Sequence, residues 1–131
     1  MGASKTIIAL GSNTASPAHL AMAQRLLREH WGDITFSRTM LTDAIGPYGD
    51  KFFNCIGLTA EAEMDATKVE AVLKQIEREC GDCREKRERG EVWLDADLLL
   101  CGGQRYHESD WQRDYIKTLL CEMNVPFNEN E

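Results

Sequence analysis

Two aspartates, Asp95 and Asp97, interrupt an otherwise apolar stretch at residues 92–101. Residues two apart on a β-strand point to the same face, so the stretch predicts two neighbouring carboxylates. The leucines at 98–100 are typical of a strand that is buried on both faces. Two unpaired charges inside a core would be strongly unfavourable, so this face is either solvated or binds a metal. We prefer metal binding, because hard carboxylate oxygens suit Mg²⁺.

Hydrophobic periodicity predicts the other elements of the chain. Strands are expected at 6–10, 34–37, 52–60 and 92–101, and helices at 17–31, 66–79 and 111–123. Ser16 is the expected N-cap of the first helix, with Pro17 at its first position. Thr67 and Glu70 have the spacing of a capping box. Residues 42–51 are expected to be irregular, and Gly57 predicts a bulge or a close backbone approach.

The order of these elements is β-α-β-β-α-β followed by one more helix. This order predicts an α+β, ferredoxin-like fold, with both crossover helices on one face and an additional C-terminal helix. The first and fourth strands would then be neighbours in the middle of the sheet. With 131 residues, we expect a single domain over 1–131.

Composition excludes several classes of protein. The net charge of −7 argues against a nucleic-acid partner. No stretch approaches the roughly 18 apolar residues of a membrane helix, and the first residues do not resemble a secretory signal. The odd number of cysteines, five, indicates reduced thiols, so a cytoplasmic protein is expected. The sequence does not predict an oligomeric state.

Cys80 and Cys83 form a CxxC motif that needs a separate interpretation. A redox CxxC usually lies at a helix N-terminus, whereas this one follows a predicted helix. A zinc site would need further ligands, for which only Cys101 and His107 lie near in sequence. Redox or zinc chemistry is therefore the minor alternative here.

A basic cluster lies between this motif and the aspartate pair, and it consists of Arg84, Lys86, Arg87 and Arg89. Its simplest interpretation is a solvated loop, because Glu85 and Glu88 alternate with the basic residues. Its position just before the aspartates favours phosphate binding instead.

Four segments, in this order, resemble the 6-hydroxymethyl-7,8-dihydropterin pyrophosphokinases of folate biosynthesis. They are IIALGSN at 7–13, FFN at 52–54, IE at 76–77 and LDADLLL at 94–100. The resemblance covers residues 6–102 and extends more weakly to 123. It implies a ferredoxin-like fold and transfer of pyrophosphate from ATP to the pterin hydroxymethyl oxygen, with release of AMP.

The resemblance also implies roles for individual residues. Asp95 and Asp97 match the ligands of two Mg²⁺ ions, and they would form the catalytic group together with Arg84 and Arg89, which could replace family arginines. The pterin would be bound by residues that include two aromatic side chains and an amide: Thr42, Ile45, Gly46, Phe52, Asn54 and Tyr115. ATP would be bound by an acidic residue and several basic ones: Glu77, Arg84, Lys86, Arg87, His107 and Arg113. His107 could instead be solvated, and Arg113 could pair with a nearby acidic residue.

The chain departs from the family pattern at two positions that normally carry arginine. Asp82 follows the glycine after the second helix, and Val92, preceded by Glu91, lies shortly before the aspartate pair. Both replaced arginines would face the triphosphate, and the acidic residues bring negative charge near it. Two hypotheses follow: an active pyrophosphokinase with cations in shifted positions, or a pterin- or nucleotide-binding domain of the same fold that is impaired or repurposed.

Overall fold

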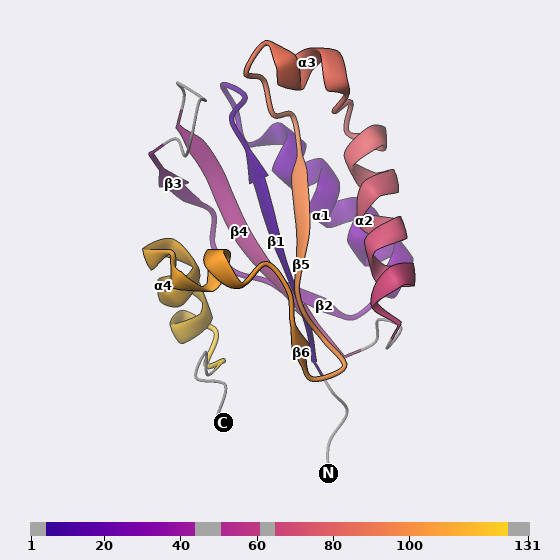
Figure 1. Ribbon diagram of the computed structural model, residues 1–131, viewed down its shortest axis with the longest axis vertical. Coiled ribbons are helices and arrows are strands. Elements are labelled where there is room, and N and C mark those ends of the chain that lie inside the picture. The colour runs from indigo at the N-terminus through magenta and orange to yellow at the C-terminus, as the bar shows by residue number, and fades with distance from the viewer. Residues whose placement is uncertain (1–4, 44–50, 61–64, 126–131) are drawn as a thin grey trace.

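The computed structural model describes residues 5–43, 51–60 and 65–125 (Figure 1). The strands are β1 (Thr6–Ser12), β2 (Ile34–Phe36), β3 (Met40–Thr42), β4 (Phe52–Thr59), β5 (Asp95–Cys101) and β6 (Gln104–Arg105). The helices are α1 (Ala18–Trp31), α2 (Ala66–Glu79), α3 (Arg84–Glu88), the 3₁₀ helix η1 (Glu108–Gln112) and α4 (Asp114–Glu122). No helix within the described ranges combines the length and apolar character needed to cross a membrane.

The strands form an antiparallel sheet in the order β2-β4-β1-β5-β6, and β3 also pairs with β4. The α+β class and the ferredoxin-like fold predicted from the sequence are therefore confirmed. The predicted first and fourth strands, β1 and β5, are neighbours as expected. On its far side β5 is paired only with the two-residue strand β6, so it is less central than β1.

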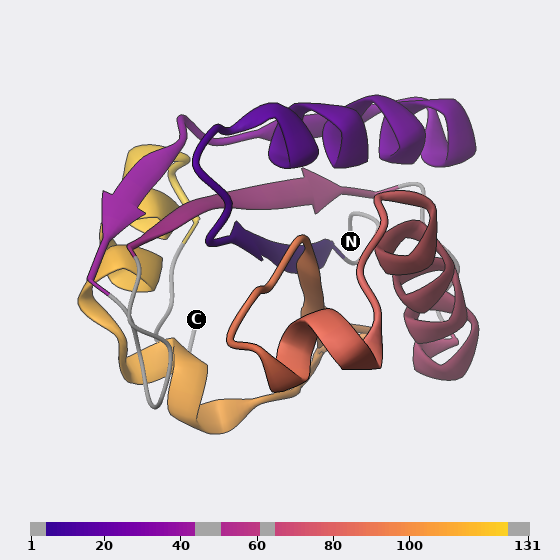
Figure 2. The same ribbon diagram turned by 90° about the horizontal axis from the view of Figure 1, so that it is seen from above.

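The two faces of the sheet are covered differently, as the view from above shows (Figure 2). Helices α1 and α2 pack on one face, where Ile8, Leu10 and Leu98 belong to one apolar cluster. Helix α4 packs on the other face, where Ile7 and Leu99 belong to a second cluster. Because strand residues alternate between faces, Asp95 and Asp97 lie on the same face as Leu99 and α4.

Two helix or strand starts and one helix cap differ from the sequence predictions. Strand β5 begins at Asp95 and not at residue 92, so the aspartates are at its start. Helix α1 begins at Ala18 with Pro17 as N-cap, although the Ser16 hydroxyl accepts a hydrogen bond from the Ala18 N–H. The proposed capping box of α2 is wrong, because Asp65 is the N-cap and its carboxylate accepts from the Thr67 N–H.

The segment at 111–123 is not one helix. It divides into η1 and α4 at Arg113, whose φ of −74° and ψ of 139° are extended. Strands β3 and β6 and helix α3 were not predicted, and β3 ends at Thr42, the first residue of the segment expected to be irregular. At Gly57 the ladder with β1 continues without a bulge. A Cβ there would lie 2.9 Å from Phe36 and 3.0 Å from Ile8, so the close approach is to side chains.

Candidate active site

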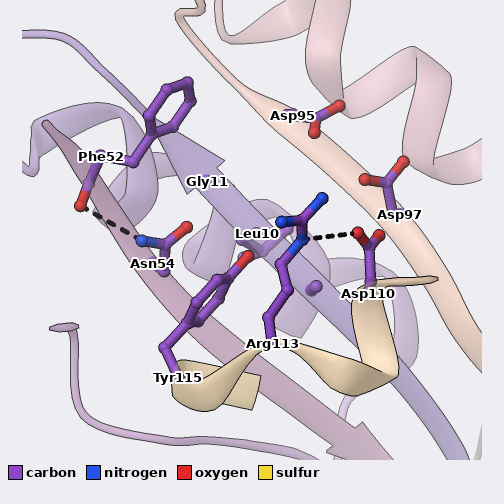
Figure 3. Close-up of a pocket in the computed structure, with 10 residues that line it drawn as sticks. Leu10, Gly11, Phe52, Asn54, Asp95, Asp97, Asp110, Arg113 and Tyr115 are labelled. Carbon is purple, nitrogen blue, oxygen red and sulfur yellow. Dashed lines mark hydrogen bonds and ion pairs between the residues drawn. The ribbon is translucent and has the colours of Figure 1, made fainter. Parts of the chain in front are cut away.

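A cavity of about 180 Å³ lies on the α4 face, where the cover provided by η1 and α4 ends (Figure 3). Strands β1, β4 and β5 form its floor, and the junction between η1 and α4 forms one wall. The residues that line it are Ala9, Leu10, Gly11, Phe52, Asn54, Asp95, Asp97, Asp110, Arg113 and Tyr115. The cavity therefore brings together six residues that the sequence assigned to a site: Phe52, Asn54, Asp95, Asp97, Arg113 and Tyr115.

The aspartate pair forms the acidic side of the cavity. The side chains of Asp95 and Asp97 are 39% and 23% exposed. Burial, and then the neighbouring Asp95 carboxylate, raise the pKa of Asp97 well above its usual range. The arrangement thus concentrates negative charge on one side of the cavity.

Glu77 supports this strand from α2, on the opposite face of the sheet. Its carboxylate is buried and accepts a hydrogen bond of 2.8 Å from the backbone N–H of Ala96, between the two aspartates. The pKa of Glu77 is raised, and burial is the largest cause of this shift. Glu77 thereby fixes the start of β5, while Lys74 lies 3.3 Å from the same carboxylate.

Asn54 lies on β4, opposite the acidic side. Its Nδ2 donates to Thr42 Oγ1 at 2.7 Å and to the carbonyl of Phe52 at 3.2 Å. Its Oδ1 turns toward Gly11 (Figure 3), where a Cβ would lie 3.2 Å from this oxygen. The amide therefore presents an acceptor to the cavity, and Gly11 leaves room for it.

Two aromatic side chains lie on opposite sides of Asn54, Phe52 from β4 and Tyr115 from the first turn of α4 (Figure 3). Burial, and then the charge of Asp110, raise the pKa of Tyr115 to about 12. The Tyr115 hydroxyl is therefore a neutral group at physiological pH.

Arg113 points into the cavity and pairs with Asp110, with 3.0 Å between Nε and Oδ1 (Figure 3). Pairing with an acidic residue was one of the two interpretations of Arg113. Asp110 was not predicted as a site residue, and its one signal in the sequence was its position three residues before Arg113. His107 lies at the edge, with its Nε2 3.9 Å from Asp97 Oδ1.

The four residues of the basic cluster have different surroundings. Only Arg87 approaches the aspartate pair, with Nη2 3.6 Å from Asp95 Oδ1. Lys86 donates to the Gly81 carbonyl at 2.6 Å and lies over the Trp93 ring. Arg89 pairs with Glu91, and Arg84 is exposed. None of these four basic residues lines the cavity itself, and Arg87 reaches only its acidic side through Asp95.

The remaining predicted site residues have separate outcomes. Thr42 contacts the site through Asn54, whereas Ile45 and Gly46 lie outside the described residues. In the CxxC motif, Cys80 is buried and Cys83 is exposed. Within residues 5–43, 51–60 and 65–125, no three His, Cys, Asp or Glu side chains are grouped to hold a metal.

The fold and the cavity define a small α+β domain with a cavity that has an acidic end and an aromatic end. The sequence model of the 7,8-dihydro-6-hydroxymethylpterin-pyrophosphokinase family matches residues 7–125. The chain therefore belongs to this family, which supports a pterin pyrophosphokinase activity in folate biosynthesis in general. A search of curated proteins found no match.

Proposed function

We propose that the chain transfers the pyrophosphoryl group of ATP to the hydroxymethyl oxygen of 6-hydroxymethyl-7,8-dihydropterin and releases AMP. The observation that carries the proposal is the composition of one cavity. Its lining includes the acidic pair Asp95 and Asp97, the amide of Asn54, and the aromatic side chains of Phe52 and Tyr115. The aromatic end suits a flat bicyclic ligand, and the acidic end suits a metal-bound polyphosphate.

The acidic end fits Mg²⁺ by the chemistry of its donors. Asp95 and Asp97 offer hard oxygens from one strand face, and their mutual repulsion would be relieved by a divalent cation. Because the described residues contain no larger acidic group, phosphate oxygens and water would complete the coordination. Bound Mg²⁺, two ions by family resemblance, would neutralise charge on the phosphates during transfer.

The other residues of the cavity position the two substrates. The Oδ1 of Asn54 would accept a hydrogen bond from an N–H edge of the pterin, and Phe52 and Tyr115 would stack on its ring. Arg113 and His107 would contact the phosphates or the nucleotide. For Glu77 we propose a positioning role, because its carboxylate is used by the backbone of β5.

An AMP assay tests the proposal. The protein is incubated with Mg-ATP and 6-hydroxymethyl-7,8-dihydropterin, and AMP is quantified. We expect pterin-dependent AMP that falls at least about 100-fold in Asp97→Asn, because a metal-binding charge is lost. Asp33→Asn is the matched control, since Asp33 is exposed and distant from the cavity lining. A folded protein that forms no AMP would refute the catalytic proposal.

One observation favours the second candidate, a binding domain without catalysis. Of the four residues in the basic cluster, only Arg87 approaches an aspartate of the pair. Phosphoryl transfer depends on cations that stabilise developing charge, so few cations favour binding over turnover. Calorimetry would separate the two candidates. The binding-domain candidate requires that the pterin binds while the AMP assay stays negative.

A further inference from the structure

Asp82 has surroundings that its position in the chain does not predict. It follows the turn after α2, yet its side chain is only 7% exposed. Its Oδ1 accepts hydrogen bonds from the backbone N–H groups of Trp93 at 2.8 Å and Leu94 at 3.3 Å. Its Oδ2 accepts from Nε of Arg87 at 2.7 Å. The carboxylate expected to bring negative charge near the phosphates is instead enclosed by three donors.

Arg87 extends from this carboxylate toward the aspartate pair. Its Nη2 donates to the Leu94 carbonyl at 2.9 Å and lies 3.6 Å from Asp95 Oδ1. The same nitrogen lies 4.0 Å from the Glu77 carboxylate. Because the guanidinium is planar and rigid, the bond at Nε fixes the direction in which Nη2 points.

We propose that Asp82 is a positioning residue, which fixes the Arg87 guanidinium beside Asp95 so that this cation serves the Mg-nucleotide. The nucleotide part of this inference rests on the proposed function, whereas the orientation of Arg87 by Asp82 does not. Arg87, rather than Arg84 or Arg89, would then be the cation in a shifted position.

A second anchor holds the segment that carries Arg87. The Asn13 amide, at the end of β1, donates to the Gly90 carbonyl at 2.7 Å and accepts from the Val92 N–H at 2.7 Å. Its backbone N–H donates to the Val92 carbonyl at 2.9 Å. The segment is therefore tied at two places, and the cation is preorganised.

The backbone hydrogen bonds that Asp82 accepts do not require its negative charge. A neutral amide oxygen at this position would still accept hydrogen bonds from the Trp93 and Leu94 N–H groups. Only the interaction with Arg87 needs a carboxylate. Asp82→Asn therefore separates the structural contribution of residue 82 from its effect on the guanidinium.

The test is a double-variant cycle on nucleotide affinity. Calorimetry measures the Kd of α,β-methylene ATP with Mg²⁺, an analogue whose αβ bond resists pyrophosphoryl transfer. We expect Asp82→Asn and Arg87→Met each to raise Kd about tenfold. The combined variant should bind no more weakly than Arg87→Met, because Asp82 acts through Arg87. Arg78→Met, an exposed position on α2, is the charge-matched control and should leave Kd unchanged. Wild-type affinity in Asp82→Asn, or effects that multiply in the combined variant, would overturn the proposal.

Two nuclear magnetic resonance readouts distinguish positioning from loss of structure. Slow exchange of the Trp93 and Leu94 amides should persist in Asp82→Asn, which shows that the segment is intact. The Arg87 Nε–H should be protected in the wild-type protein and exchange rapidly in Asp82→Asn. If the wild-type protein binds no nucleotide, the proposed function fails, but Arg87 exchange still decides the orientation. An Arg87 Nε–H that is equally protected in the wild-type protein and in Asp82→Asn would refute the orientation of Arg87 by Asp82.

Discussion

At the residue scale, Asn54 decides which ligand edge the cavity can accept. Both hydrogens of its Nδ2 have acceptors within the protein, at Thr42 Oγ1 and the Phe52 carbonyl. The amide is therefore held in one orientation, with Oδ1 as the group left for a ligand. Such a site rejects ligands that lack an N–H donor, because the buried oxygen would then remain unsatisfied.

Thr42→Val tests whether this orientation matters for binding. The change keeps the side-chain volume but removes the acceptor at 2.7 Å from Asn54 Nδ2. We expect pterin affinity, measured by calorimetry, to fall about threefold to tenfold, since one net hydrogen bond contributes about 1 kcal/mol. Mg-nucleotide affinity should not change.

Thr35→Val is the control for Thr42→Val, because Thr35 is an exposed residue of β2 and lies outside the cavity lining. It should bind the pterin as the wild-type protein does. Unchanged pterin affinity in Thr42→Val would mean that the backbone carbonyls of Phe52, at 3.2 Å, and Met40, at 3.4 Å, are sufficient to orient the Asn54 amide.

At the element scale, the position of α4 determines one wall of the cavity, because Tyr115 lies in its first turn. The apolar face of α4 packs on the sheet through Ile116, Leu119 and Leu120. A bidentate ion pair adds a tether at the other end of α4: Glu122 accepts from Nε and Nη2 of Arg38, both at 2.9 Å. This tether connects α4 to the segment between β2 and β3.

Glu122→Gln should weaken this tether in a pH-dependent way. Hydrogen bonding to Arg38 lowers the pKa of Glu122 in the folded state. Its contribution to stability is therefore present above the unfolded pKa of about 4.3 and is lost as pH falls through the lower folded value. We expect Glu122→Gln to melt at a lower temperature than the wild-type protein at pH 7, with a smaller difference at pH 3. The effect should be small because both side chains are exposed.

Arg38→Met removes the same ion pair from the other side and should reproduce the loss at pH 7. Combining both changes should add little further loss. A melting difference of equal size at pH 3 and pH 7 would show that Glu122 acts through packing and not through its charge.

Periodicity located the long elements and the short strand β2, but not β3, β6 or α3, and the reason is physical. Helices α1 and α2 and strands β1, β4 and β5 each repeat an apolar pattern over at least seven residues. Strand β3, with three residues, owes its existence to pairing with β4, which no local pattern encodes. The break between η1 and α4 at Arg113 is likewise not visible in the sequence, because the residues on either side of Arg113 keep a helical spacing of apolar side chains.

The site was predictable where residue type and strand alternation were sufficient. Asp95 and Asp97 had to share a face, and the cavity contains both. Asp110 and the role of Asp82 were missed because both depend on hydrogen bonds to groups that the sequence does not show as neighbours. An acidic residue near a phosphate site looks unfavourable until its partner, here Arg87, is known.

At the scale of the whole molecule, the sheet separates two layers with different tasks. The layer between the sheet and helices α1 and α2 is closed, and it contains most of the buried apolar side chains. The layer under α4 is smaller and ends at the cavity. We therefore expect changes that open the site to leave the closed layer intact.

The reactivity of the cysteine thiols measures how accessible this closed layer is. Cys55, Cys80 and Cys101 belong to it and are buried, whereas Cys83 and Cys121 are exposed. Burial raises the pKa of both Cys55 and Cys80 to about 11, so little thiolate forms at pH 8. We expect a disulfide reagent such as Ellman's to modify two thiols rapidly in the native protein and all five in denaturant.

The slow thiols should react at a rate set by opening of the layer, which is governed by the free energy of unfolding. A variant with Cys83→Ser and Cys121→Ser should lack the fast phase and keep the slow one. Saturating pterin and Mg-nucleotide should slow the remaining reaction, because ligands that bind only the folded state stabilise it. A third rapidly reacting thiol in the native protein would show that the layer under α1 and α2 opens locally. The cavity would then not rest on a rigid sheet.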